Sequence, residues 1–141
     1  GAFEGMLLGV NAIAVSDVSY TPKHYETAAA LAVRLAQEVL THGLPAGTML
    51  NMNVPHLPVE DLKRALITRM GRRRYEDEIV RREDPRGRNY YWIGGSMPSH
   101  HHEKGTDFEA IENLMASITP LQRDLTNHGV MPVIREWGFA L

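Results

Sequence analysis

Apolar residues recur at helical spacing between residues 28 and 39, where they form a regular hydrophobic stripe. The residues on this stripe are Ala28, Leu31, Ala32, Leu35, Ala36 and Val39. Thr21-Pro22 offers an N-cap followed by a proline suited to the first helical position, and Gly43 suits a C-cap after His42. The pattern therefore predicts an amphipathic helix that begins at Pro22 and ends at His42.

Short apolar runs flank this helix and have the length of buried strands. Ala12–Ser16 precedes the helix, and Met49–Val54 follows it and ends before Pro55. A strand, a helix and a strand in this order predict a βαβ unit with parallel strands and a right-handed crossover. A further amphipathic helix is predicted over Gly1–Gly9, already under way at residue 1 without a cap.

The remainder of the chain predicts shorter elements. Ala65–Arg69 and Ser117–Leu121 are expected to be strands, the second of them ended by Pro120. Residues 95–105 are expected to form a loop, because glycine and proline recur there. Thr106 and Glu109 have the spacing of a capping box, which predicts a helix from Asp107 to about Leu114. Residues 130–138 predict a short helix that carries Trp137.

A long charged hairpin is predicted between residues 77 and 95. Asp84-Pro85-Arg86-Gly87 matches a type I turn position by position, with Asp at i, Pro at i+1 and Gly at i+3. Tyr90–Ile93 suits a half-buried strand, and Asp77–Glu83 is its natural antiparallel mate. Because an isolated two-stranded hairpin is marginal in water, we expect a partner subunit or a folded body to cover the aromatic side.

Length and composition fit one globular domain with a single core, since the chain has 141 residues and is 43% hydrophobic. The absence of cysteine excludes a disulfide framework and fits a reducing cytoplasm. No apolar run is long enough for a transmembrane helix, and no secretory signal is recognisable. We expect a cytoplasmic protein without a membrane partner. The opening inside a predicted helix, without an initiator methionine, predicts a fragment.

Arginine is concentrated between residues 69 and 88, where eight arginines stand against five carboxylates. This excess is too small for a nucleic-acid footprint, so binding of nucleic acid is the weakest alternative. Residues 72–75, Arg-Arg-Arg-Tyr, could grip phosphates. Charge runs are more often solvated, and we favour pairing of these arginines with Glu76, Asp77 and Glu78.

His100, His101, His102 and Glu103 form the only dense group of metal-capable side chains. We predict no metal site there, because consecutive residues of a loop do not readily converge on one ion. A solvated loop is the favoured interpretation. The alternative is a flexible lid whose imidazoles contact a substrate phosphate or assist proton transfer.

Two other groups of side chains leave their role open. Tyr90, Tyr91 and Trp92 could stack on a base, although packing in a core or an interface is favoured. Asn51 and Asn53 alternate on a predicted strand near the edge where open α/β sheets bind ligands, or they satisfy loop amides. The sequence contains no dinucleotide, Walker, nucleophile-elbow or zincin motif, so it carries no complete catalytic constellation.

Several segments together resemble the SurE survival-protein family. They are Leu50–Pro55, Thr68–Tyr75 and Asp84–Gly95. Gly105–Phe108 and Ser117–Leu121 are similar to the closing helix and strand of that family, and Gly1–Gly5 resembles the helix after its Ser-Gly-Thr motif. The resemblance covers essentially the whole chain in the order of the family, and it implies the carboxyl-terminal half of such a protein.

The resemblance implies an α/β fold, the carboxyl-terminal part of a Rossmann-like body. An extended hairpin and a C-terminal helix would be swapped between the subunits of a dimer or tetramer. Residues 1–68 would complete the body, residues 69–95 would form the hairpin arm, and residues 96–141 would supply the loop, helix, strand and C-terminal helix. The arm residues expected to serve oligomerisation are Arg81, Asp84, Arg86, Gly87, Tyr90, Tyr91 and Trp92.

The resemblance also implies hydrolysis of nucleoside 5′- or 3′-monophosphates with a divalent metal, Mg²⁺ or Mn²⁺. The metal ligands of the family are an Asp-Asp pair in an Asn-Asp-Asp-Gly motif, a Ser and an Asn, and none matches a position here. We therefore predict no catalytic or metal-ligating residue in this chain and no activity of the chain alone. His100, His101, His102 and Arg72 are its candidate substrate contacts. The alternative function is a non-catalytic oligomerisation module.

Overall fold

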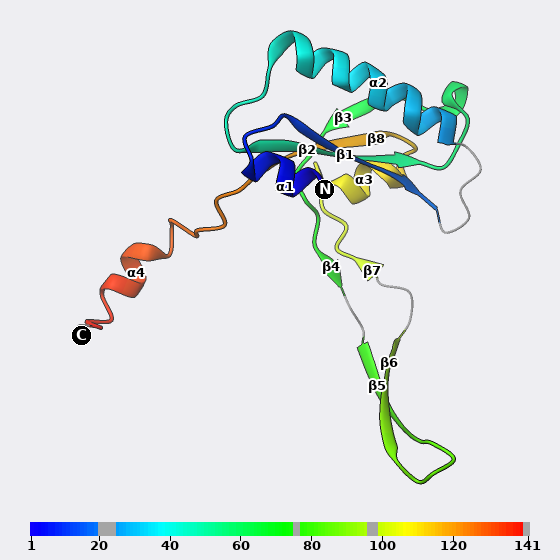
Figure 1. Cartoon of the computed structure of the whole chain (residues 1–141), viewed down its shortest axis with the longest axis vertical. Coiled ribbons are helices and arrows are strands. Elements are labelled where there is room, and N and C mark those ends of the chain that lie inside the picture. The colour runs from blue at the N-terminus through cyan, green and yellow to red at the C-terminus, as the bar shows by residue number, and fades with distance from the viewer. Residues whose placement is uncertain (20–24, 75–76, 96–98, 140–141) are drawn as a thin grey trace.

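The computed structural model describes residues 1–19, 25–74, 77–95 and 99–139, which form a layered α/β body and two extensions that leave it (Figure 1). The helices are α1 (Ala2–Leu7), α2 (Tyr25–His42), the 3-10 turn η1 (Val59–Asp61), α3 (Asp107–Glu112) and α4 (Met131–Arg135). The strands are β1 (Ala12–Val18), β2 (Thr48–Pro55), β3 (Ala65–Ile67), β4 (Arg73–Arg74), β5 (Asp77–Glu83), β6 (Asn89–Gly95), β7 (Ser99–His100) and β8 (Ala116–Gln122). The predicted α/β class is confirmed.

The body is built on a four-stranded sheet in the order β1-β2-β8-β3. β1 and β2 are parallel, from Ala12 opposite Met49 to Val18 opposite Pro55, which confirms the predicted βαβ unit. The predicted burial of the first strand is wrong. β1 lies at the edge of the described sheet, and its Val15 and Val18 are 38% and 47% exposed.

Helix α2 matches the predicted amphipathic helix, although its predicted start at Thr21-Pro22 lies outside the described residues. Its end is as predicted, because Gly43 has a φ of +74° and donates its amide to the Val39 carbonyl at 2.8 Å. Among the helices in the described part of the chain, none combines the length and the apolar character needed to cross a bilayer.

Strand β8 continues through Pro120, where the sequence predicts an end. Antiparallel pairing with β2 runs from Thr48 opposite Gln122 to Asn53 opposite Ser117, whereas β3 pairs only with residues 116–118 of β8. The Ile118 carbonyl accepts from the Thr68 amide, so this side of β8 faces β3, and residue 120 presents its nitrogen to the same side. The ladder to β3 has already ended there, so the missing N–H of proline interrupts no hydrogen bond.

Helix α2 lies over one face of the sheet (Figure 1), and apolar side chains fill the space between them. Met52 and Val54 of β2 are 1% and 0% exposed and form a cluster with Ala28 of α2 and Ala116 of β8. The stripe residues Leu31, Ala32 and Leu35 pack against this cluster, together with Leu62 and Ile118. Alternation along β2 and β8 sends Met52 and Val54 of β2 and Ala116 and Ile118 of β8 into this core.

Helices α1 and α3 lie under the opposite face of the sheet (Figure 1). On the α3 side, this face carries a row of polar side chains. Asn53 donates its amide to the Ser117 hydroxyl at 3.3 Å, and the Thr68 and Thr119 hydroxyls are 2.8 Å apart. Ser117 and Thr119 are only 0% and 2% exposed, yet each has its partner. Among the described residues no buried side-chain nitrogen or oxygen lacks a hydrogen bond, so this polar layer is fully satisfied.

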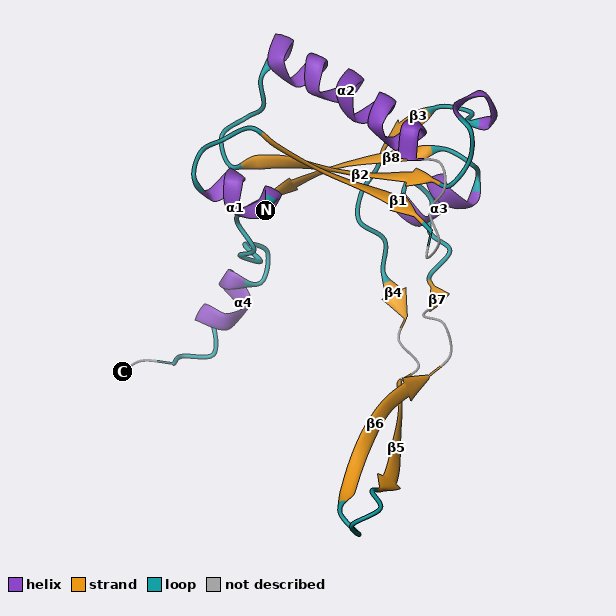
Figure 2. Ribbon diagram, turned by 45° about the vertical axis from the view of Figure 1, so that its right-hand side comes forward, coloured by secondary structure: helices purple, strands orange, loops and turns teal. Residues whose placement is uncertain are grey.

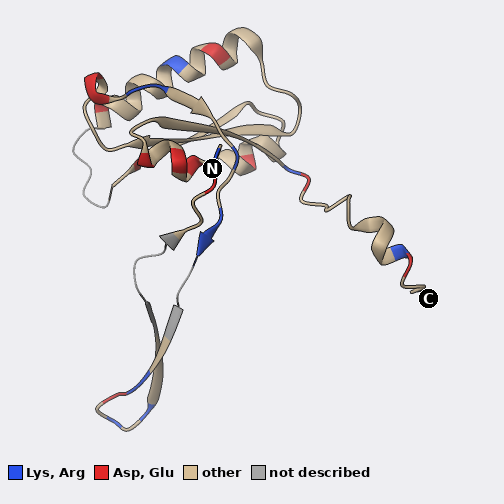
Figure 3. Cartoon of the chain, turned by 180° about the vertical axis from the view of Figure 1, so that it is seen from behind, with Lys and Arg blue, Asp and Glu red and all other residues tan. Residues whose placement is uncertain are grey.

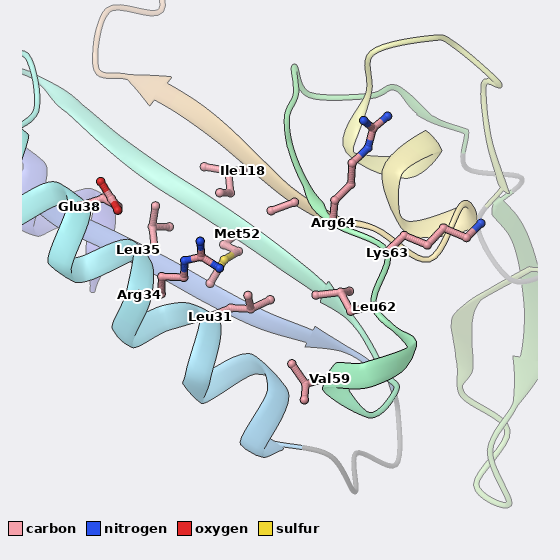
Figure 4. A pocket seen from close by; sticks show the side chains of 11 residues that line it. Leu31, Arg34, Leu35, Glu38, Met52, Val59, Leu62, Lys63, Arg64 and Ile118 are labelled. Carbon is pink, nitrogen blue, oxygen red and sulfur yellow. The ribbon is translucent and has the colours of Figure 1, made fainter.

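An open hollow of about 640 Å³ lies between α2 and the strands β2, β3 and β8 (Figure 4). Its floor is apolar, with Leu31, Leu35, Met52 and Ile118 pointing into it. Arg34, Glu38, Lys63 and Arg64 supply its charged groups. It is a shallow extension of the apolar core and brings no convergent polar groups together.

The predicted hairpin is confirmed, because β5 and β6 pair antiparallel from Asp77 opposite Gly95 to Glu83 opposite Asn89. The Gly87 amide donates to the Asp84 carbonyl at 3.0 Å, and Gly87 has a φ of +77°, which requires glycine. The Asp84 carboxylate accepts from the backbone amides of residues 86 and 88 at 2.8 and 2.9 Å. The predicted turn chemistry thus fixes the hairpin tip.

The hairpin, which we call the arm (residues 77–95), projects away from the body (Figure 2). Its tip carries both basic and acidic residues (Figure 3). Its apolar side chains are exposed instead of packed, with Ile79, Tyr91 and Trp92 at 67%, 64% and 60% and Tyr90 at 43%. The body therefore does not cover the aromatic residues of the arm.

The chain after β8 forms the second extension, and it contains α4, which is shorter than predicted. The helix spans Met131–Arg135, and Trp137 lies beyond it in a turn. The side chains of this extension are largely exposed as well, including Trp137 at 72% and Phe139 at 84%.

Helix α3 begins at the predicted position but ends two residues early, at Glu112. The Thr106 hydroxyl accepts from the Glu109 amide at 3.3 Å, as a capping box requires. The reciprocal bond differs, because the Glu109 carboxylate accepts from Gly105 at 2.6 Å, one residue before the N-cap. The cap also bonds back to the Glu103 carbonyl through the Thr106 hydroxyl at 2.7 Å, which ties the preceding segment to the helix start.

The core account predicts that Met52→Ala lowers the free energy of unfolding by about 2–5 kcal/mol, because it leaves a cavity between α2 and the sheet. Met52→Leu should cost less than about 1.5 kcal/mol, since it keeps the volume. Leu40→Ala removes a side chain that is 83% exposed on α2 and serves as the control. Urea unfolding of the three variants measures these values, and an equal loss for Met52→Ala and Leu40→Ala would contradict the assigned core.

Candidate functional site

Strands β4 and β7 form the base of the arm, next to the body. Several polar side chains that the sequence analysis singled out lie there. β4 and β7 pair antiparallel, with Arg73 opposite His100 and Arg74 opposite Ser99. The His101 amide donates to the Arg72 carbonyl at 3.1 Å and extends this pairing. The prediction that residues 95–105 form only a loop is therefore wrong at Ser99–His100, because tertiary pairing with β4 imposes an extended backbone there.

Glu103 joins two arginines at this base. Its carboxylate accepts from Arg69 Nη2 at 2.8 Å and from Arg72 Nη2 and Nε at 2.6 and 2.9 Å. The hydrogen bond from Arg69, followed by that from Arg72, lowers the pKa of the Glu103 carboxyl below its usual value of 4.5. Arg72 thus pairs with a residue 31 positions along the chain. The side chains of its predicted partners, Glu76, Asp77 and Glu78, lie outside the described part, so that pairing stays a prediction. Residues 75 and 76 lie outside the described part.

Phe108, the second residue of α3, anchors the two strands of the base. Its ring stacks on the His100 imidazole with centroids 4.3 Å apart and planes 5° apart, and the Arg73 guanidinium lies 5.9 Å from its centroid. The neighbouring Asp107 carboxylate accepts from the Gly71 amide at 2.7 Å. A Cβ at Gly71 would lie 2.3 Å from the Phe108 ring, so only glycine fits this approach. We call these contacts the Phe108 clip.

Two imidazoles of the predicted histidine group, those of His100 and His102, converge on one carboxylate. His100 Nε2 lies 2.8 Å from Glu112 Oε1, and His102 Nδ1 lies 3.4 Å from the same oxygen. The rings of His100 and His102 meet edge to face, with centroids 5.1 Å apart. The ligand atoms of these three residues lie within 4.8 Å of one another, whereas Glu103 is engaged by arginines. The sequence analysis did not single out Glu112. The only available sign was its place near the end of the predicted helix that follows the histidines.

A hollow of about 470 Å³ lies between this base and the polar face of the sheet. Its polar lining consists of Asn51, Asn53, Arg73, His100, Asp107 and Glu112. Asn51 and Asn53 do reach a concave site, and Asn53 donates to the Ser117 hydroxyl of β8 and not to a loop amide. A guanidinium, an imidazole and two amides around one hollow could hydrogen-bond an anionic oxygen ligand.

A further acid–base pair lies at the carboxyl ends of the two parallel strands. His56 Nδ1 lies 3.0 Å from both carboxylate oxygens of Asp17. The Asp17 side chain is only 5% exposed and that of His56 is 20% exposed. Sequence reasoning missed this pair, because its members are 39 residues apart and meet only through the β1–β2 register.

Comparison with known proteins gives a consistent result. A model of the family described as survival protein SurE matches residues 1–77. The 5′-nucleotidase SurE of Geobacter sulfurreducens is 48% identical over 140 residues, covering 99% of this chain and 53% of the relative. The 5′-nucleotidase SurE of Methylococcus capsulatus is 41% identical, covering 96% of this chain and 54% of the relative.

A solved structure shares the fold at similar coverage. The SurE protein from Aquifex aeolicus superposes with a TM-score of 0.79 at 36% identity, covering 98% of this chain and 56% of that chain. The present chain thus spans about half the length of the relatives it matches.

The Phe108 clip predicts that Gly71→Ala destabilises the protein by about 1–3 kcal/mol, because the added methyl must displace the Phe108 ring. Gly129→Ala is the matched control, since the nearest atom to its Cβ is 3.5 Å away. Thermal and urea unfolding compare the two variants. Equal stability would show that the clip does not constrain the base of the arm.

Proposed function

This chain belongs to the survival protein SurE family, and we propose that it forms part of a divalent-metal-dependent nucleotidase. The reaction is hydrolysis of nucleoside 5′- or 3′-monophosphates to nucleoside and phosphate. The observation that carries this proposal is identity of 46–49% to several proteins named 5′-nucleotidase SurE, over nearly all of this chain. Because the chain spans about half of each relative, it would supply one part of the whole enzyme.

The residues present do not fit the metal set that the resemblance implies. The sequence contains no Asn-Asp-Asp-Gly and no Ser-Gly-Thr motif, so no position corresponds to the implied ligands or the phosphate loop. We derive no catalytic step through Mg²⁺ or Mn²⁺ in this chain. We propose instead that this chain corresponds to the carboxyl-terminal half and that the metal is held by the other part of the enzyme. The exposed edge of β1 supports this, since parallel strands are normally covered by neighbours.

The contribution of this chain to substrate binding would come from the hollow beside the Phe108 clip. Arg73 and His100 both line it, and Asn51 and Asn53 add amide donors. Phosphate monoesters suit such a lining, because guanidinium and amide N–H groups donate to phosphate oxygens. Of the candidate contacts from the sequence, His100 lies at the hollow, whereas Arg72 is bound by Glu103.

We also propose that the arm and the C-terminal extension assemble subunits into a dimer or tetramer. Supporting this, both extensions leave the body and expose large apolar side chains, among them Trp92 on the arm and Trp137 after α4. Scattered exposure is ordinary, but aromatic residues grouped on a thin projecting hairpin are typical of an interface. A non-catalytic assembly module remains the second candidate function, and the same exposed residues support it.

The activity proposal predicts that the 141-residue chain releases no phosphate from nucleoside monophosphates above background with Mg²⁺ or Mn²⁺. A chimera that joins it to the remaining part of the Geobacter sulfurreducens relative should be active. A colorimetric phosphate assay measures both. Metal-dependent turnover by the 141-residue chain would contradict the assignment of the metal ligands to the other part, and an inactive but folded chimera would favour the assembly module.

The assembly proposal predicts that Trp92→Ala weakens subunit association, by about 3–5 kcal/mol if the ring is fully buried between subunits. Tyr25→Ala is the control, because Tyr25 is an aromatic residue of the body with a similar exposure of 62%. Sedimentation equilibrium measures the association constants. A stable monomer at high concentration, with the arm ordered, would contradict the proposed role.

A further inference from the structure

We propose that His100, His102 and Glu112 bind one transition-metal ion of the Zn²⁺ type at the base of the arm. The ligand atoms of these three residues lie within 4.8 Å of one another. Two separations from Glu112 Oε1 are short, 2.8 Å to His100 Nε2 and 3.4 Å to His102 Nδ1. Ligands held about 2.0–2.1 Å from a tetrahedral ion lie about 3.3 Å apart, so small side-chain rotations suffice to admit the ion.

The backbone explains why these residues converge although two of them are near neighbours in sequence. Residues two apart on an extended segment point to the same side, and His100 ends β7 just before His102. Glu112 is the last residue of α3. His101, between the two histidines, is not a member of the cluster. The ligands thus come from two separate segments of the chain. The sequence alone did not reveal that these segments meet.

The cluster is both positioned and accessible. The His100 ring is held by stacking on Phe108 at 4.3 Å, so one ligand is fixed before an ion arrives. The side chains of His100, Glu112 and His102 are 22%, 42% and 80% exposed, which leaves a path from solvent. An ion there would join the segment of β7 and His102 to α3, and it would stabilise the base of the arm.

The donor set selects the class of ion. Two imidazoles and one carboxylate suit Zn²⁺, Co²⁺ or Ni²⁺, whereas Mg²⁺ and Ca²⁺ prefer oxygen ligands throughout. Three protein ligands leave a position for water or for an oxygen of another ligand. The proposal therefore differs in residues and in ion class from the Mg²⁺ or Mn²⁺ implied by the resemblance, and it does not rest on the proposed nucleotidase activity.

The test uses the untagged 141-residue chain, stripped with a chelator, and titrates it with ZnCl₂ by calorimetry. We expect one saturable equivalent, a rise in the melting temperature with Zn²⁺, and visible absorption bands with Co²⁺ typical of mixed nitrogen and oxygen ligands. His102→Ala and Glu112→Gln should each weaken Zn²⁺ binding at least about 10-fold, since even loss of a group supporting a ligand costs about 10–100-fold.

The matched control is His101→Ala, which removes an imidazole from the same segment but not from the cluster. It should leave the affinity and the melting shift within about twofold of the unsubstituted chain. Circular dichroism checks the fold of each variant, and the high exposure of His102 makes His102→Ala the safest substitution. The proposal is overturned if no saturable binding occurs, or if His101→Ala weakens binding as much as His102→Ala does.

Discussion

The structure depends on the alternation of side chains along the two central strands, β2 and β8. Met52, Val54 and Ala116 enter the core beneath α2, so the residues between them must face the other way. That second face carries Asn53, Ser117 and Thr119. Asn53 bonds to Ser117, and the Thr119 hydroxyl bonds to that of Thr68. A slip of one residue in register would bury amides against α2 and expose methionine, so hydrophobic burial fixes the polar layer as well.

The polar layer in turn determines where chemistry can occur. The hollow lined by Asn51 and Asn53 is also lined by Asp107 and Phe108 of α3, which belong to the Phe108 clip. The same clip holds both strands of the arm's base, because Gly71 lies against one side of the Phe108 ring and His100 stacks on it. The hollow, the base of the arm and the cluster of His100, His102 and Glu112 therefore share one structural support.

Local signals in the sequence predicted much of the fold. The stripe of α2, its Gly43 cap and the turn at Asp84–Gly87 were all confirmed, because each depends on neighbouring residues in the chain. Predictions failed where tertiary pairing changed the outcome. Pro120 did not end β8, since the neighbouring ladder stops before it, and Ser99–His100 became a strand because β4 pairs with it. The pair of Arg72 with Glu103, 31 residues along the chain, also formed through tertiary contact and was not predicted.

The sequence by itself determined the α/β class, the arm with its turn, and, through resemblance, membership of the SurE family. Periodicity, turn chemistry and family motifs are local properties, so they can be read without coordinates. Only the tertiary structure decided that His100 and His102 meet Glu112, that Asp17 meets His56, and that Glu103 joins two arginines. These contacts depend on strand register and on the placement of α3, which follow from packing of the whole chain and not from any one segment.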